Sequence, residues 1–120
     1  MKLGIRGRHI ELTAPLLAHV ERRLRFALSR FAQKIRQIAV QVTDLNGPRG
    51  GLDKQCRVTA TLSPSGKVMV GATDADLHTA IDRAADRLQR SVTRELEQRR
   101  EARKKEYVFT VSDAVGSKQR

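Results

Sequence analysis

Residues 55–73, "QCRVTATLSPSGKVMVGAT", decide the fold, because they predict a β-hairpin. Strict alternation of apolar and polar side chains is typical of strands with one buried face. The central "SPSG", residues 63–66, has the composition of a tight turn. The apolar side chains occupy every second position on both sides of that turn: Cys56, Val58, Ala60 and Leu62, then Val68, Val70 and Ala72.

Two further strands are predicted upstream of the hairpin. Residues 37–45, "QIAVQVTDL", direct Ile38, Val40 and Val42 to one side. Residues 2–7, "KLGIRG", form a shorter alternating stretch. The last three strands favour a meander, and the opening strand must pair within the same sheet.

Two amphipathic helices complete the pattern. Thr13 is a suitable N-cap for a helix of about five turns through Lys34. Its apolar positions recur at threes and fours: Leu17, Val20, Leu24, Ala27, Leu28 and Phe31. A second helix is predicted from Asp74 to about Lys105, with Leu77, Ile81, Ala84, Leu88 and Val92 as its buried stripe. The order β-α-β-β-β-α predicts an α+β fold with two helices packed on one face of a four-stranded sheet.

The length of 120 residues predicts one domain, which we place at residues 1–105. Residues 106–120 are predicted to be a mobile C-terminal tail. The stretch "EYVFTVSDAV" in this region also has enough apolar character for a short strand or for docking on a partner.

The charge balance narrows the class of partner. The chain has 24 Lys and Arg against 13 Asp and Glu, a net charge of +11. Residues 1–43 alone hold nine basic and two acidic side chains, so the excess lies in the folded part. Such a charge favours nucleic acid or an anionic membrane as partner. Short apolar runs predict no transmembrane helix or secretory signal, so we expect a cytoplasmic protein.

Four arginines on the second helix form the most specific pattern. Arg83, Arg87, Arg90 and Arg94 are spaced by four, three and four, which places them on one stripe beside the apolar face. Their mutual repulsion is relieved if phosphates bind there. We expect Asp82 and Asp86 to lie away from this stripe, with Asp86 and Arg90 as an ordinary ion pair of the helix. A solvated charged face is the competing interpretation.

The first helix adds basic side chains that have Glu21 as nearly their only acidic neighbour: Arg22, Arg23, Arg25, Arg30 and Lys34. Two basic helices on one face of a sheet can form a broad surface for polyanions. Since aromatic residues are only 3% of the chain, recognition of folded RNA by shape and backbone fits better than stacking on single-stranded bases. This reasoning does not separate RNA from DNA.

The element order, the helix start "IELTAPLLAHVERRL" and the stretch "DADLHTAIDRAADRLQRSVTR" resemble a known family. It is the bacterial family of ribosome hibernation-promoting factors, also called ribosome-associated inhibitors or sigma-54 modulation proteins, and the match is to its short form. The similarity covers about residues 1–98. It implies a domain that sits between the head and body of the small ribosomal subunit, overlaps the tRNA and mRNA sites, and stops translation during ribosome storage.

The resemblance also implies site residues. Arg23, Arg87, Arg90 and Arg94 match family contacts to rRNA, and Arg83 extends that row. With the neighbouring first-helix arginines, the predicted rRNA-binding residues are Arg22, Arg23, Arg25, Arg30, Arg83, Arg87, Arg90 and Arg94.

Three features depart from the family pattern. Phe26 and Ser29 stand where well-known members carry lysine, and Phe26 is predicted to be exposed. The loop at residues 44–54 is longer than in compact members.

Rival chemistries find little support in the residues. The glycines of the 44–54 loop are not followed by the Gly-Lys-Ser/Thr of a phosphate loop, although Arg49 and Lys54 could touch RNA. Asp44, Asn46 and Asp53 miss the calcium-loop spacing. Cys56 is predicted to lie in the core rather than to act as a nucleophile. We therefore expect no enzyme activity, no cofactor and no metal. The alternatives to a ribosome-binding factor are a general RNA- or DNA-binding module and a protein-interaction subunit without nucleic acid.

Overall fold

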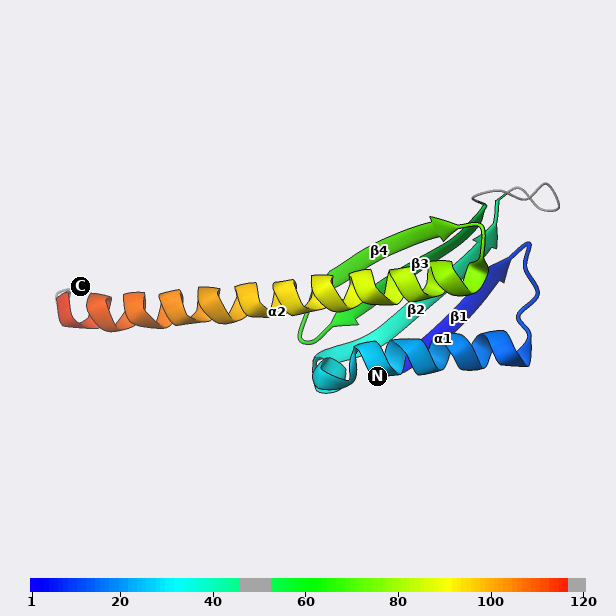
Figure 1. Ribbon diagram of the computed structural model, residues 1–120. Helices are drawn as coiled ribbons and strands as arrows, with labels where there is room; N and C mark the ends of the chain where they lie inside the picture. Colours follow the sequence, from blue (N-terminus) through cyan, green and yellow to red (C-terminus); the bar gives the residue numbers. More distant parts are fainter. Residues whose placement is uncertain (46–52, 117–120) are drawn as a thin grey trace.

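The computed structural model contains one four-stranded sheet (Figure 1). It describes residues 1–45 and 53–116, with side chains as far as Ala102. The strands follow one another across the sheet in chain order. β1 runs parallel to β2, and the β2–β3 and β3–β4 pairs are antiparallel. The strands are β1 (Lys2–Arg8), β2 (Ile35–Asp44), β3 (Lys54–Leu62) and β4 (Lys67–Asp74).

The helices are α1 (Ala14–Ala27), the short 3₁₀ helix η1 (Ser29–Lys34) and α2 (Leu77–Gly116). Parallel strands need a crossover connection, and α1 with η1 supplies it between β1 and β2. α1 and α2 cover the same face of the sheet (Figure 1). The predicted α+β fold, with the order β-α-β-β-β-α and both helices on one face, is confirmed.

α1 begins as predicted and ends earlier. The Thr13 hydroxyl oxygen accepts a hydrogen bond from the backbone N–H of Leu16 at 3.3 Å, which caps the helix. Leu28, buried in the core, leaves the helical conformation at φ −112°, and the chain continues as η1. The expected five-turn helix is therefore wrong in its last third, because the chain must turn there to bring Ile35 into β2.

The core lies between the helices and the inner face of the sheet. The predicted alternation is confirmed, since Ile38, Val40 and Val42 of β2 are buried. On α1, Leu16 is buried where the sequence pattern favoured Leu17. Cys56 is 1% exposed, and its burial raises the pKa of the thiol to about 12. Cys56 is thus a core residue, as predicted.

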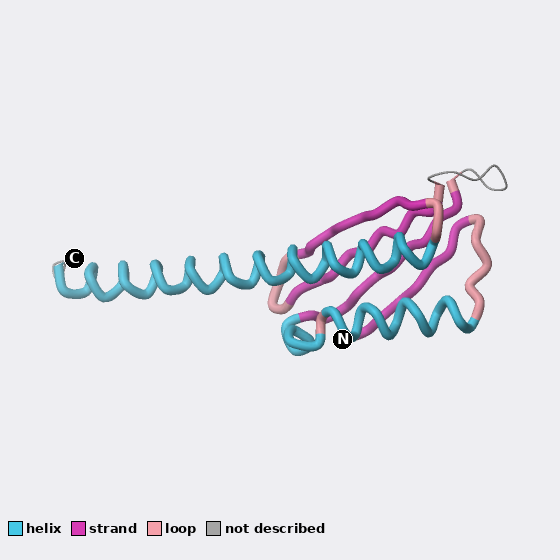
Figure 2. Tube along the Cα trace, viewed as in Figure 1, coloured by secondary structure: helices cyan, strands magenta, loops and turns pink. Residues whose placement is uncertain are grey.

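α2 is longer than the sequence predicted. It continues past Lys105 to Gly116 and projects beyond the sheet (Figure 2). The molecule is therefore elongated, with extents of 71 × 23 × 18 Å. At the other end, Asp76 accepts hydrogen bonds from the backbone N–H and the hydroxyl of Thr79, both at 2.9 Å. These bonds hold the pKa of Asp76 below its usual value and fix the helix start.

Candidate nucleic-acid interface

The arginine row of α2, Arg83, Arg87, Arg90 and Arg94, lies on the surface. All four side chains are exposed, whereas Ala84, Leu88 and Val92 of the same helix are buried. Packing of this apolar stripe on the sheet therefore fixes the rotation of the helix and points the row away from the core.

The row lies on the flank of α2 that faces β4. Arg83 approaches Asp74, at the end of β4, with 3.7 Å between Nη2 and Oδ2. Arg87 donates a hydrogen bond from Nη1 to the carbonyl oxygen of Gly71 in β4, at 2.5 Å. A carbonyl group does not neutralise a guanidinium charge, and the Arg83 contact is too long for a hydrogen bond. Arg87 thus keeps its charge available to an external anion, whereas Arg83 shares its charge with Asp74.

Arg90 and Arg94 are the two members of the row best suited to bind an external anion. Neither makes an ion pair or a hydrogen bond with any residue that the structure describes. They stand four residues apart on one side of α2, which corresponds to about 6 Å along the helix axis. Two exposed guanidinium groups at this spacing can bind successive phosphate groups of a phosphodiester backbone, each through paired N–H donors.

Asp82 and Asp86 of α2 point toward α1 instead. Arg23 of α1 donates from Nε to Asp82 Oδ1 at 3.0 Å and from Nη2 to Asp86 Oδ1 at 3.0 Å. Its Nη2 also donates to the backbone carbonyl of Asp82 at 3.1 Å. The expected Asp86–Arg90 pair is therefore wrong, because Asp86 faces the neighbouring helix and binds Arg23. Asp82 and Asp86 do lie away from the row, as predicted.

Arg23 consequently acts first as a brace between the two helices. Its side chain is only 24% exposed, and two of its nitrogens bind carboxylates of α2. Its predicted role as an rRNA contact stays a prediction. His19 lies beside it, with Nε2 at 2.9 Å from Asp82 Oδ1, and the His19 ring is 4.5 Å from that of His78. Spacing in the sequence could not have paired these two histidines, because they lie on different helices.

The other predicted residues of the first helix region are not joined to the row. Arg22 is exposed and has no ion pair or hydrogen bond among the described residues. Arg25 donates to Glu21 at 3.0 Å, and the Arg30 guanidinium stacks on the Phe31 ring at 5.0 Å from its centre. The contacts of Arg23 lie on the flank of α2 that faces α1, away from the row. The structure therefore shows two basic areas where the sequence suggested one broad surface.

Other candidates have simpler explanations. Lys54 pairs with Asp53 at 3.0 Å and with Asp44 at 3.6 Å, and the hydrogen bond to Asp53 raises the pKa of Lys54. Arg49 and Asn46 lie outside the described residues. Within the described ranges no group of three or more His, Cys, Asp or Glu side chains could hold a metal ion. Phe26 is 78% exposed, as predicted.

No described helix is both long and apolar enough to cross a membrane.

A sheet covered on one face by two helices, with guanidinium groups on the longer helix that have no partner among the described residues, defines a small basic α+β domain suited to polyanions. Residues 3–100 match the family model described as "Sigma 54 modulation protein / S30EA ribosomal protein", and the chain belongs to that family. The resemblance found in the sequence is confirmed.

Relatives with known names agree with this assignment. The chain is 33% identical over 99 residues to a "Ribosome hibernation promoting factor" of Pseudomonas putida, covering 81% of this chain and 88% of that protein. It is also 33% identical over 102 residues to a "Ribosome hibernation promotion factor" of Deinococcus radiodurans, of which it spans about half, 52%.

Solved structures show the same fold. The N-terminal domain of Thermus thermophilus Protein Y superposes with a TM-score of 0.66 at 31% identity, covering 78% of this chain and 98% of that domain. A ribosomal subunit interface protein from Coxiella burnetii gives a TM-score of 0.67 at 16% identity, covering 81% and 99%, and this likeness concerns the fold alone.

Proposed function

We propose that this protein binds the rRNA of the small ribosomal subunit in the channel used by tRNA and mRNA, and inhibits translation while ribosomes are stored. The observation that carries the proposal is the arginine row, in which Arg90 and Arg94 lack partners among the described residues. Membership of a family of ribosome-associated factors supports the ribosome as partner.

The arrangement of charges explains how the row would bind. Asp82 and Asp86 are held by Arg23, so they do not compete with phosphates for Arg90 and Arg94. Phosphate binding relieves the repulsion within the row and releases counterions from the RNA. The protein then acts by occupying space in the channel, without a chemical reaction. A ribosome partner implies a cytoplasmic location.

The two basic areas would have different tasks. The row supplies the central contacts, while Arg22, Arg25 and Arg30 would reach a second segment of rRNA from the side of α1. Arg25 must release Glu21 to bind a phosphate, an exchange that costs little because the pair is about half exposed on both sides. Arg23 supports both areas by holding the helices together.

Charge reversal of the row tests the proposal. The triple variant Arg87→Glu, Arg90→Glu and Arg94→Glu is expected to fold and to lose co-sedimentation with small subunits. A matched control, Lys34→Glu, Arg36→Glu and Arg100→Glu, changes the net charge equally at exposed positions outside the row. Retained binding by the row variant, or equal loss by the control, contradicts the proposal.

The alternatives are separated by competition. Small subunits and duplex DNA are offered at equal concentration of nucleotide phosphate. Preference for the subunit supports the proposal, equal competition indicates a general nucleic-acid-binding module, and no binding of either at moderate salt indicates a protein-interaction subunit. Addition of the wild-type protein to a cell-free translation reaction then tests inhibition directly.

A further inference from the structure

The face of the sheet opposite the helices, here called the outer face, is a third basic surface, separate from the row and from the arginines of α1 and η1. Strand register places its side chains in four rows that cross the sheet. No row contains a carboxylate, although five of the side chains are cationic. From one end of the sheet to the other the rows are Lys2–Gln37–Thr61–Lys67, Gly4–Ala39–Thr59–Met69, Arg6–Gln41–Arg57–Gly71 and Arg8–Thr43–Gln55–Thr73.

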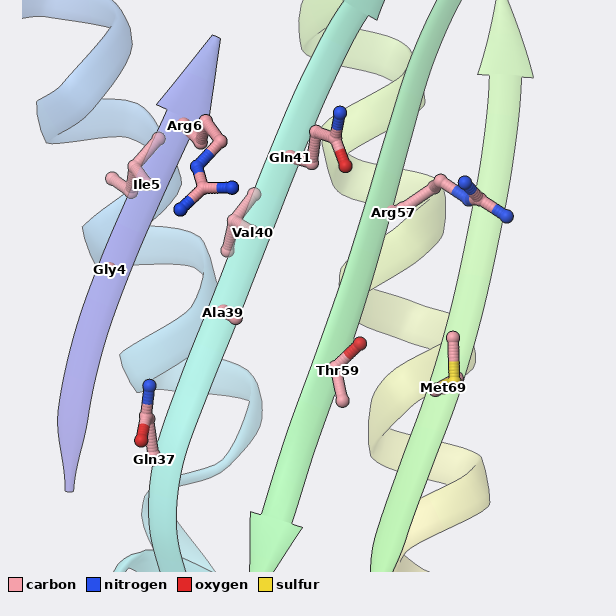
Figure 3. Close-up of a pocket in the computed structure, with 10 residues that line it drawn as sticks. All are labelled: Gly4, Ile5, Arg6, Gln37, Ala39, Val40, Gln41, Arg57, Thr59 and Met69. Atoms are coloured by element: carbon pink, nitrogen blue, oxygen red, sulfur yellow. The ribbon is translucent and has the colours of Figure 1, made fainter.

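The second row forms the floor of a hollow. A Cβ atom placed on Gly4 would meet nothing within 4 Å, and its neighbour in the row is Ala39. The hollow has a volume of about 400 Å³ and is lined by Arg6, Arg57 and the amides Gln37 and Gln41, among others. Figure 3 shows Arg6 leaning from β1 toward β2 and Arg57 reaching from β3 across β4. Small side chains thus leave a trough with polar and cationic groups along its sides.

The charged groups of this trough are not engaged within the protein. Arg6 and Arg57 are exposed, and neither has an ion pair or hydrogen bond among the described residues. The described carboxylates at the nearby strand ends have partners outside the trough: Asp44 and Asp53 pair with Lys54, and Asp74 pairs with Arg83. The positive charge of the outer face is therefore not offset locally.

The width of the trough fits one extended polynucleotide strand. Alternate residues of a β-strand are about 6.7 Å apart, so the rows on either side of the floor are separated by roughly 13 Å. Long side chains narrow this space further, which suits a single strand better than a duplex. The floor offers no aromatic ring, and Met69, 69% exposed, is its one large apolar group. Contacts to phosphate and ribose groups are thus favoured over base stacking.

The outer face continues into the arginine row around the edge of the sheet. β4 is an edge strand, and a second hollow over it is lined by both Arg57 and Arg87. Arg87 reaches this edge from α2 through its hydrogen bond to Gly71. A polynucleotide strand bound to the row can therefore continue over β4 into the trough and remain in contact with positively charged surface.

We propose that the outer face is a further binding surface, which takes single-stranded RNA, and that Arg6 and Arg57 bind the sugar-phosphate backbone there. The choice of RNA as the ligand rests on the proposed function of the row. The two surfaces lie on opposite sides of the sheet, so a result that overturns RNA binding at one surface does not overturn it at the other. Single-stranded RNA would thus bind the face of the sheet that the helices do not cover. Bound RNA then covers both sides of the domain.

Salt dependence of RNA binding tests the inference. The probe is a fluorescein-labelled oligouridylate of about 15 nucleotides, a length comparable with the single-stranded sites of other proteins. Each phosphate contact contributes about −0.7 to the slope of log K against log salt for single strands. The variant Arg6→Gln with Arg57→Gln is therefore expected to reduce the slope by about 1.4. The control Lys34→Gln with Arg100→Gln removes the same charge outside both surfaces and is expected to keep the slope.

Crosslinking locates the RNA independently of affinity. Because Cys56 is buried, a photoreactive thiol reagent labels an introduced cysteine selectively. Met69→Cys in the trough is expected to crosslink the oligouridylate, as is Gln98→Cys beyond the row, whereas Ala32→Cys in η1 is not. An unchanged slope for the Arg6 and Arg57 variant overturns the inference, as does crosslinking from Gln98→Cys alone. Failure of the wild-type protein to co-sediment with small subunits would instead overturn the proposed function.

Discussion

The role of Arg23 separates structural from RNA-binding arginines, and its replacement makes a quantitative prediction. In Arg23→Met the apolar stem is kept, but the guanidinium group that joins α1 to α2 is lost. Asp82 retains His19, whereas Asp86 loses its partner within the described residues. We therefore expect the variant to be less stable without losing its fold.

The magnitude follows from exposure. Exposed ion pairs are worth about 0.2–1 kcal/mol, and hydrogen bonds to charged groups about 1.5–3 kcal/mol. The Arg23 side chain is 24% exposed and the two carboxylates are 44% and 56% exposed, so the brace lies between these limits. We expect a loss of about 1–2 kcal/mol in the free energy of unfolding. In a domain of about 100 residues this lowers Tm by about 4–16 °C.

The assay is urea denaturation paired with subunit binding. The comparison variant, Arg90→Met with Arg94→Met, is expected to unfold within about 0.5 kcal/mol of wild type, because these groups touch no described partner. It should nevertheless bind subunits more weakly and with a smaller salt slope. A double-mutant cycle of Arg23→Met with Asp86→Asn measures the brace itself. Wild-type stability of Arg23→Met, combined with a reduced salt slope, would refute the reasoning and place Arg23 in the interface.

Three further outcomes are expected. Asp76→Ala is expected to lower the free energy of unfolding. Folding depresses the pKa of Asp76 from 3.8, so the stabilisation that its carboxylate supplies is fully present above that pH and is lost as the pH falls through the folded-state pKa. Urea titrations should therefore show the full stability difference between wild type and variant above pH 3.8, and a smaller difference at lower pH. The Cys56 thiol, with a pKa of about 12, should resist Ellman's reagent at a pH of about 8 until denaturant is added, and rapid reaction of the native protein would contradict its burial. Gly66→Ala should cost about 1 kcal/mol or more, since Gly66 has φ +103° and its Cβ would meet the Arg99 guanidinium group, whereas Gly4→Ala at an open position should be nearly neutral in thermal unfolding.

Local pattern was enough to predict the sheet. Side-chain alternation has a period of two, so the inward positions Val58 and Ala60 follow directly from their neighbours once one face is buried. The apolar stripe of α2 was equally clear, because Leu88 and Val92 repeat at helical spacing. These signals depend on residues close in the chain, and the structure confirms them.

Where tertiary contacts decide, local pattern failed. The helix beginning at Ala14 ends at Ala27, although its apolar periodicity continues to Phe31, because the chain must re-enter the sheet at Ile35. Asp86 had a suitable partner four residues away in Arg90 but binds Arg23, 63 residues distant in sequence. The packing of one helix on another is not encoded in the spacing within either.

The misassigned ion pair strengthens the argument for anion binding. A pair between Asp86 and Arg90 would have neutralised part of the row and left the brace unmade. In the structure each acid of this stretch of α2 serves the contact with α1, so one flank of α2 is neutralised and the other stays positive. The separation of acids from arginines on one helix thus stabilises the domain and at the same time preserves a charged edge beside β4. That edge joins the outer face through Arg87, so a polyanion meets continuous positive surface from α2 to β1.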